Sequence, residues 1–143
     1  MRNTRNTLVA LAFALSPITA FAMPDMFKHA TAMNVSPEIP AAKGEVKFGR
    51  TDDGNISIHL SVRYLADPQK LRPPAATYVV WVSRDKDSPA QNVGALKTEK
   101  DREGKIKTVT PFKAFQLFVT AEANGEVQAP MGTRLLWIDY NSD

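Results

Sequence analysis

The chain has no cysteine among its 143 residues. This absence excludes disulfide bonds, thiol catalysis and the metal sites that thiolates build. Stability must therefore come from a hydrophobic core, which about 100 ordered residues can supply. Only two histidines are present, so there are few candidates for acid–base catalysis.

No apolar run in the sequence reaches the roughly 20 residues that a membrane-spanning helix needs. The run Leu8–Leu15 follows Arg2 and Arg5 and precedes the small-x-small site Ala20–Ala22. This order is typical of a secretory signal peptide. We expect residues 1–22 to be cleaved after Ala22, which would make the mature protein periplasmic or secreted. An uncleaved membrane anchor is the alternative.

Charge of one sign is not in large excess. The chain carries 18 Lys and Arg against 15 Asp and Glu, a formal charge of +3. Cleavage of the leader removes Arg2 and Arg5 and no acid, which leaves 16 basic and 15 acidic residues, or +1. The balance gives no support to nucleic-acid binding.

The segment 23–43 shows no sustained hydrophobic period. Its three prolines, Pro24, Pro37 and Pro40, favour an extended backbone because proline disfavours helix in the residue before it. We interpret this segment as a linker in front of a folded domain at 44–143. A short helix over Asp25–Met33 is an alternative.

The run Thr77–Val82 consists mainly of β-branched and aromatic residues, which predicts a strand buried on both faces. Ile56–Tyr64 alternates apolar and polar residues over nine positions and predicts a strand with one solvated face. A turn rich in Asp, Gly and Asn at Thr51–Asn55 precedes it. We therefore expect an antiparallel hairpin with Glu45–Phe48.

The remaining strand patterns are separated by turns and a proline-rich crossover at Ala66–Ala75. They are Asn92–Thr98, Ile106–Thr110, Phe112–Glu122 and Arg134–Tyr140. Seven short strands at this spacing predict an all-β fold, an antiparallel immunoglobulin-like β-sandwich. We expect Trp81 and Trp137 to anchor the core between the two sheets.

Part of this pattern resembles the extracytoplasmic C-terminal domain of anti-sigma-K-type factors. The shared features are an apolar strand, a proline-rich crossover, a Tyr-x-x-Trp strand and a Val-Thr-x-Glu strand before a Gly/Pro turn. They fall on Tyr64–Pro68, Pro73–Val82, Asn92–Gly94, Phe118–Glu122, Gly125, Pro130 and Gly132. The resemblance spans about Gly44 to Trp137.

The resemblance implies a β-sandwich outside the cytoplasm of a bacterium. Anti-sigma factors of this type also carry a cytosolic helical domain, often with a zinc motif, and a transmembrane helix. This chain has a cleavable leader and no cysteine instead. The resemblance therefore does not imply inhibition of a sigma factor.

Four residues near the start of the mature chain form the one candidate metal site. Met23, Met26, His29 and Met33 offer thioether and imidazole ligands, which suit Cu(I). The alternatives are incidental methionines in a linker and a small amphipathic helix docked on the sandwich.

The candidates for catalysis are weak. His59 lies between Ser57 and Ser61 on the polar side of a strand, without the glycine-flanked serine turn of a nucleophile elbow. Asp52 and Asp53 have the composition of a hairpin turn and lack the spacing of a calcium loop.

Two loops of mixed charge could serve protein recognition. They are Arg84–Asp87 and Lys97–Glu103, and loops at the ends of sandwich strands are common binding sites.

The sequence thus predicts an exported, non-enzymatic interaction module with no cofactor. We expect it to bind a protein or another envelope component through loops at one end of the sandwich. We expect neither nucleic-acid binding nor stable membrane insertion after leader cleavage. Periplasmic copper handling through the Met/His segment is the alternative function.

Overall fold

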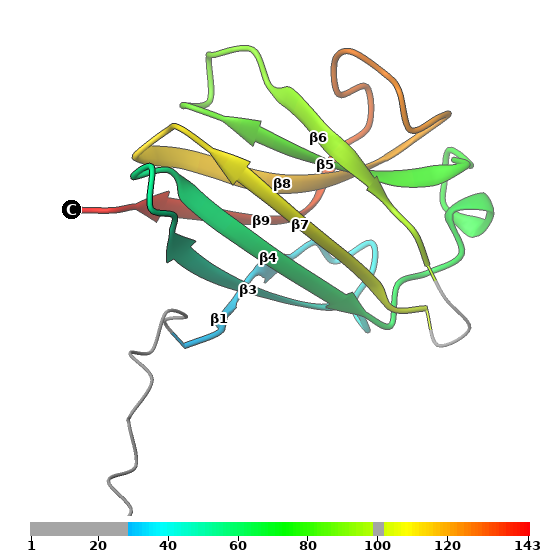
Figure 1. The fold of residues 1–143 in the computed structure, drawn as a ribbon. Coiled ribbons are helices and arrows are strands. Elements are labelled where there is room, and N and C mark those ends of the chain that lie inside the picture. The colour runs from blue at the N-terminus through cyan, green and yellow to red at the C-terminus, as the bar shows by residue number, and fades with distance from the viewer. Residues whose placement is uncertain (1–28, 99–101) are drawn as a thin grey trace, which may run out of the picture.

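The computed structural model describes residues 29–98 and 102–143. Two antiparallel sheets lie face to face (Figure 1). Their strands are β1 (Thr31–Ala32), β2 (Asn34–Val35), β3 (Lys43–Arg50), β4 (Ile56–Arg63), β5 (Thr77–Ser83), β6 (Gln91–Leu96), β7 (Gly104–Thr110), β8 (Ala114–Glu122) and β9 (Arg134–Asn141).

The four-stranded sheet has the order β1-β3-β4-β7, and the five-stranded sheet has the order β2-β9-β8-β5-β6. The seven expected strands correspond to β3–β9, and the predicted all-β sandwich is confirmed. The hairpin between β3 and β4 is also confirmed, with Lys47 opposite His59 and Val46 opposite Leu60. Within the described ranges, no helix is long and apolar enough to cross a membrane.

The interpretation of residues 23–43 as a linker is wrong for the described part, 29–43. β1 pairs with β3, and β2 pairs with β9. Met33 lies between these two short strands, and its side chain is buried with those of Ile39 and Ala42. The helix considered over Asp25–Met33 is likewise absent from residues 29–33. Two-residue strands carry no visible period, because pairing with distant strands holds them in place rather than local propensity.

The core between the sheets follows the two-residue period of the strands. In β5, the side chains of Tyr78, Val80 and Val82 face the four-stranded sheet. In β8, the inward positions are those of Phe115, Leu117 and Val119. The other buried residues of this core are Met33, Ile39, Ala42, Val46, Phe48, Ile56, Ile58, Leu60, Val62, Leu65, Leu96, Leu135, Leu136 and Ile138.

A second, smaller core lies on the outer side of the five-stranded sheet. It consists of Val79, Trp81 and Phe118, with the half-buried Trp137 packed against them. The expectation that both tryptophans anchor the space between the sheets is therefore wrong. Trp81 is fully buried, but it alternates with Val80 and Val82 and so points to the opposite face.

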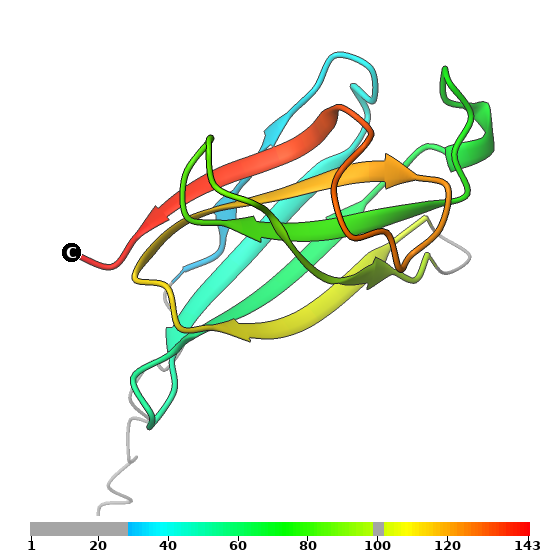
Figure 2. The same cartoon turned by 90° about the horizontal axis from the view of Figure 1, so that it is seen from above.

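The β8–β9 loop, residues 123–133, covers this outer core. Figure 2 shows the loop over the outer side of β5, reaching towards β6. Val127 of the loop packs against the outer core, and the Arg134 guanidinium lies 4.2 Å from the centroid of the Phe118 ring. The predicted burial of β5 on both faces is thus confirmed, with a loop rather than a third layer covering the outer face.

The proline-rich segment is a crossover between the sheets, as expected. It contains one 3₁₀ turn, η1 (Pro68–Lys70), capped by Asp67. The Tyr78 hydroxyl donates a hydrogen bond of 2.6 Å to the Ala66 carbonyl. Burial, with a smaller contribution from Asp67, raises the pKa of Tyr78 to about 12. The phenol therefore stays protonated and keeps the crossover fixed to β5.

Candidate functional site

A buried chain of hydrogen bonds connects β5, β8 and the β8–β9 loop. The Trp81 indole N–H donates to Thr120 Oγ1 at 2.8 Å, and the Thr120 hydroxyl donates to Glu122 Oε1 at 2.5 Å. All three residues are buried. Hydrogen bonds in such a chain polarise and strengthen one another in a region of low dielectric constant.

Glu122 extends this chain into the β8–β9 loop. Its Oε1 atom also accepts hydrogen bonds from the backbone N–H groups of Met131 and Gly132, at 3.0 and 3.2 Å. Burial of a carboxyl group is costly unless its hydrogen bonds are satisfied. Here one oxygen accepts three donors, and two of these donors belong to the loop. The loop is therefore held on the sheet at its C-terminal side.

Asn92 of β6 holds the other side of the same loop. Its Nδ2 group donates to the carbonyls of Gly125 and Val127, both at 2.9 Å. Its Oδ1 atom accepts a hydrogen bond of 2.9 Å from the Gly94 N–H. Gly94 has a φ of 134°, a conformation open to glycine, and the pairing of β6 with β5 is irregular here. One side chain thus fixes both the irregular strand and the loop.

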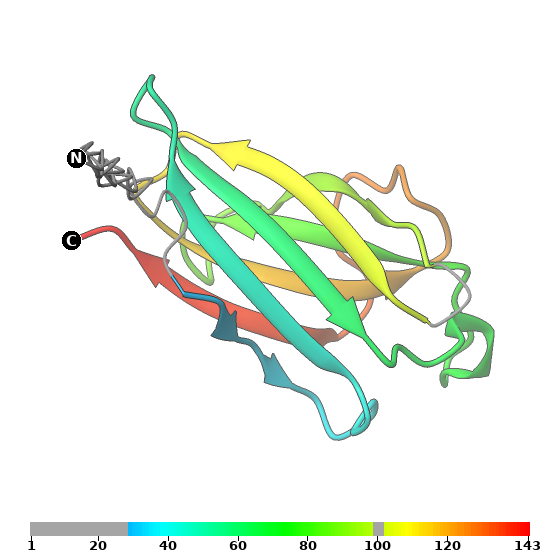
Figure 3. The same ribbon diagram turned by 60° about the horizontal axis from the view of Figure 1, so that its bottom comes forward.

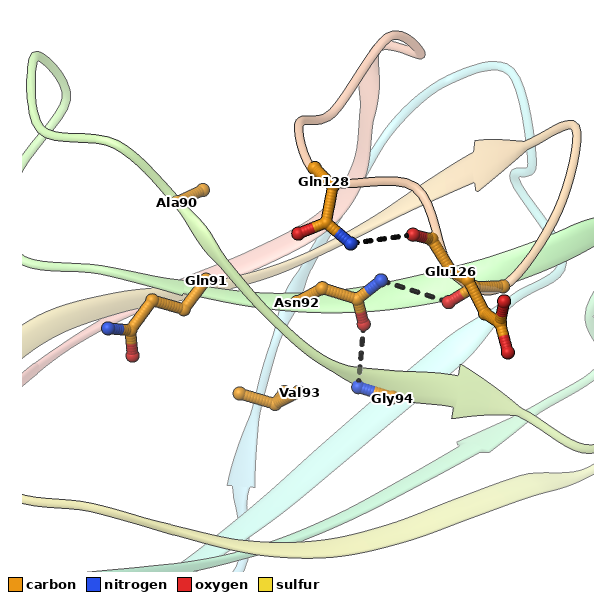
Figure 4. Close-up of a pocket in the computed structure, with 8 residues that line it drawn as sticks. Ala90, Gln91, Asn92, Val93, Gly94, Glu126 and Gln128 are labelled. Carbon is orange, nitrogen blue, oxygen red and sulfur yellow. Dashed lines mark hydrogen bonds between the residues drawn. The ribbon is translucent and has the colours of Figure 1, made fainter.

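A groove lies between β6 and the β8–β9 loop, and we call it the β6 groove. Its volume is about 840 Å³. Figure 4 shows residues of β6 along one wall and Glu126 and Gln128 on the loop. The lining residues are Ala90, Gln91, Asn92, Val93, Gly94, Gly125, Glu126 and Gln128. The lining is rich in amide groups and has one carboxylate.

A different surface is found on the outer side of the four-stranded sheet. Figure 3 looks onto this side, and no described segment crosses in front of β3, β4 and β7. The register places Lys47 opposite His59, and His59 opposite Lys107. We call these three side chains the cationic row. They lie along a hollow of about 450 Å³ that Glu45, Arg63, Glu103 and Lys105 also line.

The surroundings of His59 disfavour its protonated form. Partial burial lowers the pKa of His59 from its ordinary value of 6.5, and the charges of Lys107 and Lys47 lower it further. Since the folded state binds the proton less well than the unfolded state, protonation of His59 destabilises the fold. This loss begins as the pH falls through about 6.5 and is complete below the lowered pKa of His59.

Removal of either lysine should raise the pKa of His59. We expect a larger rise for Lys107→Gln than for Lys47→Gln, because Lys107 has the stronger effect on His59. NMR titration of the imidazole resonances between about pH 5 and 8 measures this directly. Lys86→Gln, on the exposed β5–β6 loop, is the control and should leave the pKa unchanged. A wild-type pKa at or above 6.5 would contradict the prediction.

The four candidate copper ligands are not brought together by the described residues. Met23 and Met26 lie outside them. His29 is exposed, whereas Met33 is buried between the sheets, with its backbone N–H donating to the Gly44 carbonyl at 2.9 Å. The candidate role of Met33 as a ligand is therefore wrong, because its thioether packs in the core. No group of three or more His, Asp or Glu residues suited to a metal occurs in the described ranges.

The other candidates have local structural roles. Asp52 and Asp53 are exposed in the β3–β4 turn. In the loop Arg84–Asp87, Asp85 accepts hydrogen bonds from the backbone N–H groups of Asp87 and Ser88. Together with the Ser88 hydroxyl, these bonds lower the pKa of Asp85. Part of the second charged loop, residues 99–101, lies outside the described residues.

Sequence reasoning missed Asn92 and Glu122, which hold the loop. The sequence set neither residue apart, because Glu122 shares its face of β8 with Gln116 and Thr120, and Asn92 follows another amide, Gln91.

A scan against protein-family models and a search of the curated proteins found no match for this chain.

Proposed function

We propose that this protein is an exported, non-enzymatic binding module that holds an extended segment of a partner protein in the β6 groove. The leader pattern in residues 1–22 supports export. The resemblance of residues 44–137 to an extracytoplasmic domain supports a role in the cell envelope. Peptide binding can be measured on the purified mature chain, and that measurement depends neither on export nor on the resemblance.

The edge position of β6 supports recognition of an extended peptide. β6 pairs with β5 on one side and ends the five-stranded sheet on the other. Edge strands carry backbone groups that can pair with an added strand, and pockets beside them select its side chains. The irregular pairing at Val80 and Trp81 prevents indiscriminate edge-to-edge pairing. A binding site here would therefore depend on the groove as well as on the strand.

The fixed loop is the observation that carries the proposal. Loops at sandwich edges are commonly mobile, and ordering them on binding costs free energy. Here Glu122 and Asn92 hold the β8–β9 loop from both sides with four hydrogen bonds to its backbone. The wall of the groove is thus preorganised before any partner arrives.

The lining indicates the chemistry of the partner segment. Gln91 and Gln128 are exposed amides that can both donate and accept hydrogen bonds. Glu126 adds one exposed negative charge. These groups favour a polar segment with a Lys or Arg side chain next to Glu126.

Selection from a library of random linear peptides tests this function with the mature chain. We expect selected peptides to slow hydrogen exchange in β6 and to contain a basic residue. Asn92→Ala should weaken their binding on the order of tenfold, because it releases the loop. Lys86→Gln is the control and should bind as the wild type does. Selection of no peptide, or protection mapped to another strand, would refute the proposed site.

A further inference from the structure

We propose that the cationic row of Lys47, His59 and Lys107 binds a phosphoryl group, in a phosphodiester of the cell envelope. This site lies on the four-stranded sheet, away from the β6 groove. It is independent of the proposed peptide binding.

The cationic row is unfavourable for folding when His59 is protonated. Residues directly opposite in neighbouring antiparallel strands have Cβ atoms about 4.5–5.5 Å apart, and like charges at this spacing repel. His59 has such a neighbour on each side, Lys47 from β3 and Lys107 from β7. A bound anion would turn this repulsion into attraction.

The carboxylates near the row have other partners. Glu45 pairs with Arg63 of β4 at 3.5 Å, and Glu103 pairs with Lys105 of β7 at 3.3 Å. Neither neutralises Lys47 or Lys107, so both ammonium groups are available to an incoming anion. Arg63 and Lys105 add positive charge at the same end as the two carboxylates.

The hollow beside the row gives room for the ligand. It is lined by all three members of the row, together with Ser61 and parts of Leu60 and Ile106. Its volume of about 450 Å³ is enough for a phosphoryl group and the part of the molecule that bears it. The open sheet face in Figure 3 leaves access from solvent.

The side chains of the row are of types that bind phosphate. Lysine is a common phosphate ligand and acts as a point charge, whereas the planar fork of arginine makes paired hydrogen bonds to carboxylates and phosphates alike. The row places two ammonium groups on either side of one imidazole, on the same face of the sheet. Arg63, the arginine lining the hollow, is already paired with Glu45.

Binding at this site should be coupled to the protonation of His59. A bound anion favours the imidazolium and therefore raises the pKa of His59. By linkage, the affinity for the anion must increase as the pH falls through the same range. The other charged groups that line the same hollow are Lys47, Lys107, Glu45, Arg63, Glu103 and Lys105.

NMR titration of the mature protein with glycerophosphorylglycerol, a soluble phosphodiester, tests the site. We expect the His59 resonances to shift and the pKa of His59 to rise, with affinity increasing between about pH 7.5 and 5.5. Ala30 also lines the hollow, so the resonances of its neighbour His29 are not used as the reference. The side-chain amide of Asn92, in the β6 groove, serves as the internal reference. Unchanged His59 resonances at saturating diester would overturn the proposal.

Charge variants separate a specific site from a diffuse positive surface. Lys47→Gln and Lys107→Gln should each weaken binding about three- to tenfold, and the double variant should abolish it. Lys70→Gln and Lys86→Gln remove one exposed charge elsewhere and should have no effect. Equal losses in all four variants, or equal affinity for acetate, would overturn the proposal. Asn92→Ala should leave diester binding unchanged. The peptide proposal and the diester proposal can therefore be refuted independently of each other.

Vesicles identify the source of the phosphoryl group. Much tighter binding to phosphatidylglycerol vesicles than to the soluble diester supports an anionic lipid headgroup. Phosphatidylcholine vesicles, whose phosphodiester is balanced by a quaternary ammonium group, are the control without net charge. Equal affinity supports a soluble or polymeric phosphodiester. In either case the loss on Lys47→Gln must match that seen with the soluble diester, or the vesicles are bound elsewhere.

Discussion

Replacement of Trp81 by alanine is expected to lower the free energy of unfolding by roughly 3–5 kcal/mol. The indole is fully buried in the outer core, stacked near Phe118 with ring centroids 6.5 Å apart. Its removal leaves a cavity and takes the indole donor from Thr120. Since small domains are stable by about 5–15 kcal/mol, this loss is a large share of the total. Urea unfolding followed by circular dichroism measures it.

Two further variants locate the origin of this effect. Trp81→Phe keeps an aromatic ring but removes the N–H donor, so it should lower the free energy of unfolding by less than Trp81→Ala does. Trp137→Ala removes a half-buried indole at the rim of the same cluster and should also cost less. If Trp81→Ala unfolds at the wild-type urea midpoint, the outer cluster does not contribute to stability as we describe.

Replacement of Glu122 by alanine is expected to cost roughly 2–4 kcal/mol. The change removes the shared acceptor of Thr120, Met131 and Gly132. A buried donor left without a partner costs about 1–3 kcal/mol, although water can reach the two loop N–H groups in part. We also expect faster hydrogen exchange at Met131 and Gly132, because the loop is released on that side.

The control for this variant lies on the same loop. Glu126→Ala removes an exposed carboxylate and should change stability by no more than about 0.5 kcal/mol. Glu122→Gln keeps one acceptor oxygen, so its loss of stability should lie between the losses for Glu122→Ala and Glu126→Ala. Equal stability of Glu122→Ala and Glu126→Ala would show that the buried hydrogen bonds do not hold the loop.

The strands with a clear two-residue period could be predicted from the sequence. The alternation of Ile56–Tyr64 gave both the strand β4 and its solvated face, because Ile56, Ile58, Leu60 and Val62 are buried against the other sheet. The prediction is wrong for Tyr64, the last residue of the predicted strand, since it lies beyond β4 and is exposed. β1 and β2 could not be found in this way. Each has two residues, and each exists because a distant strand, β3 or β9, offers it an edge.

The placement of Trp81 shows a second limit. A strand covered on both sides has apolar residues at every position, so its pattern does not reveal which face meets the other sheet. The cover over Trp81 is a loop that depends on Asn92 and Glu122. Asn92 reaches the loop over a separation of 33 residues, and no local pattern encodes such a contact.

Only part of the cationic row could be predicted from the sequence. Alternation placed His59 on the solvated side of its strand. Its neighbours Lys47 and Lys107 follow from the registers of β4 with β3 and β7. The second of these pairings joins strands that are separated by β5 and β6 in the chain, and composition alone does not indicate it.

The pairing of β2 with β9 brings the two ends of the folded chain together, since Asn34 lies opposite Trp137. The edge that β2 forms in the five-stranded sheet can therefore form only after the last strand has been synthesised. Contacts between segments so distant in the chain make folding slow. The five-stranded sheet is therefore completed on this side only once the C-terminal strand β9 is available to pair with β2.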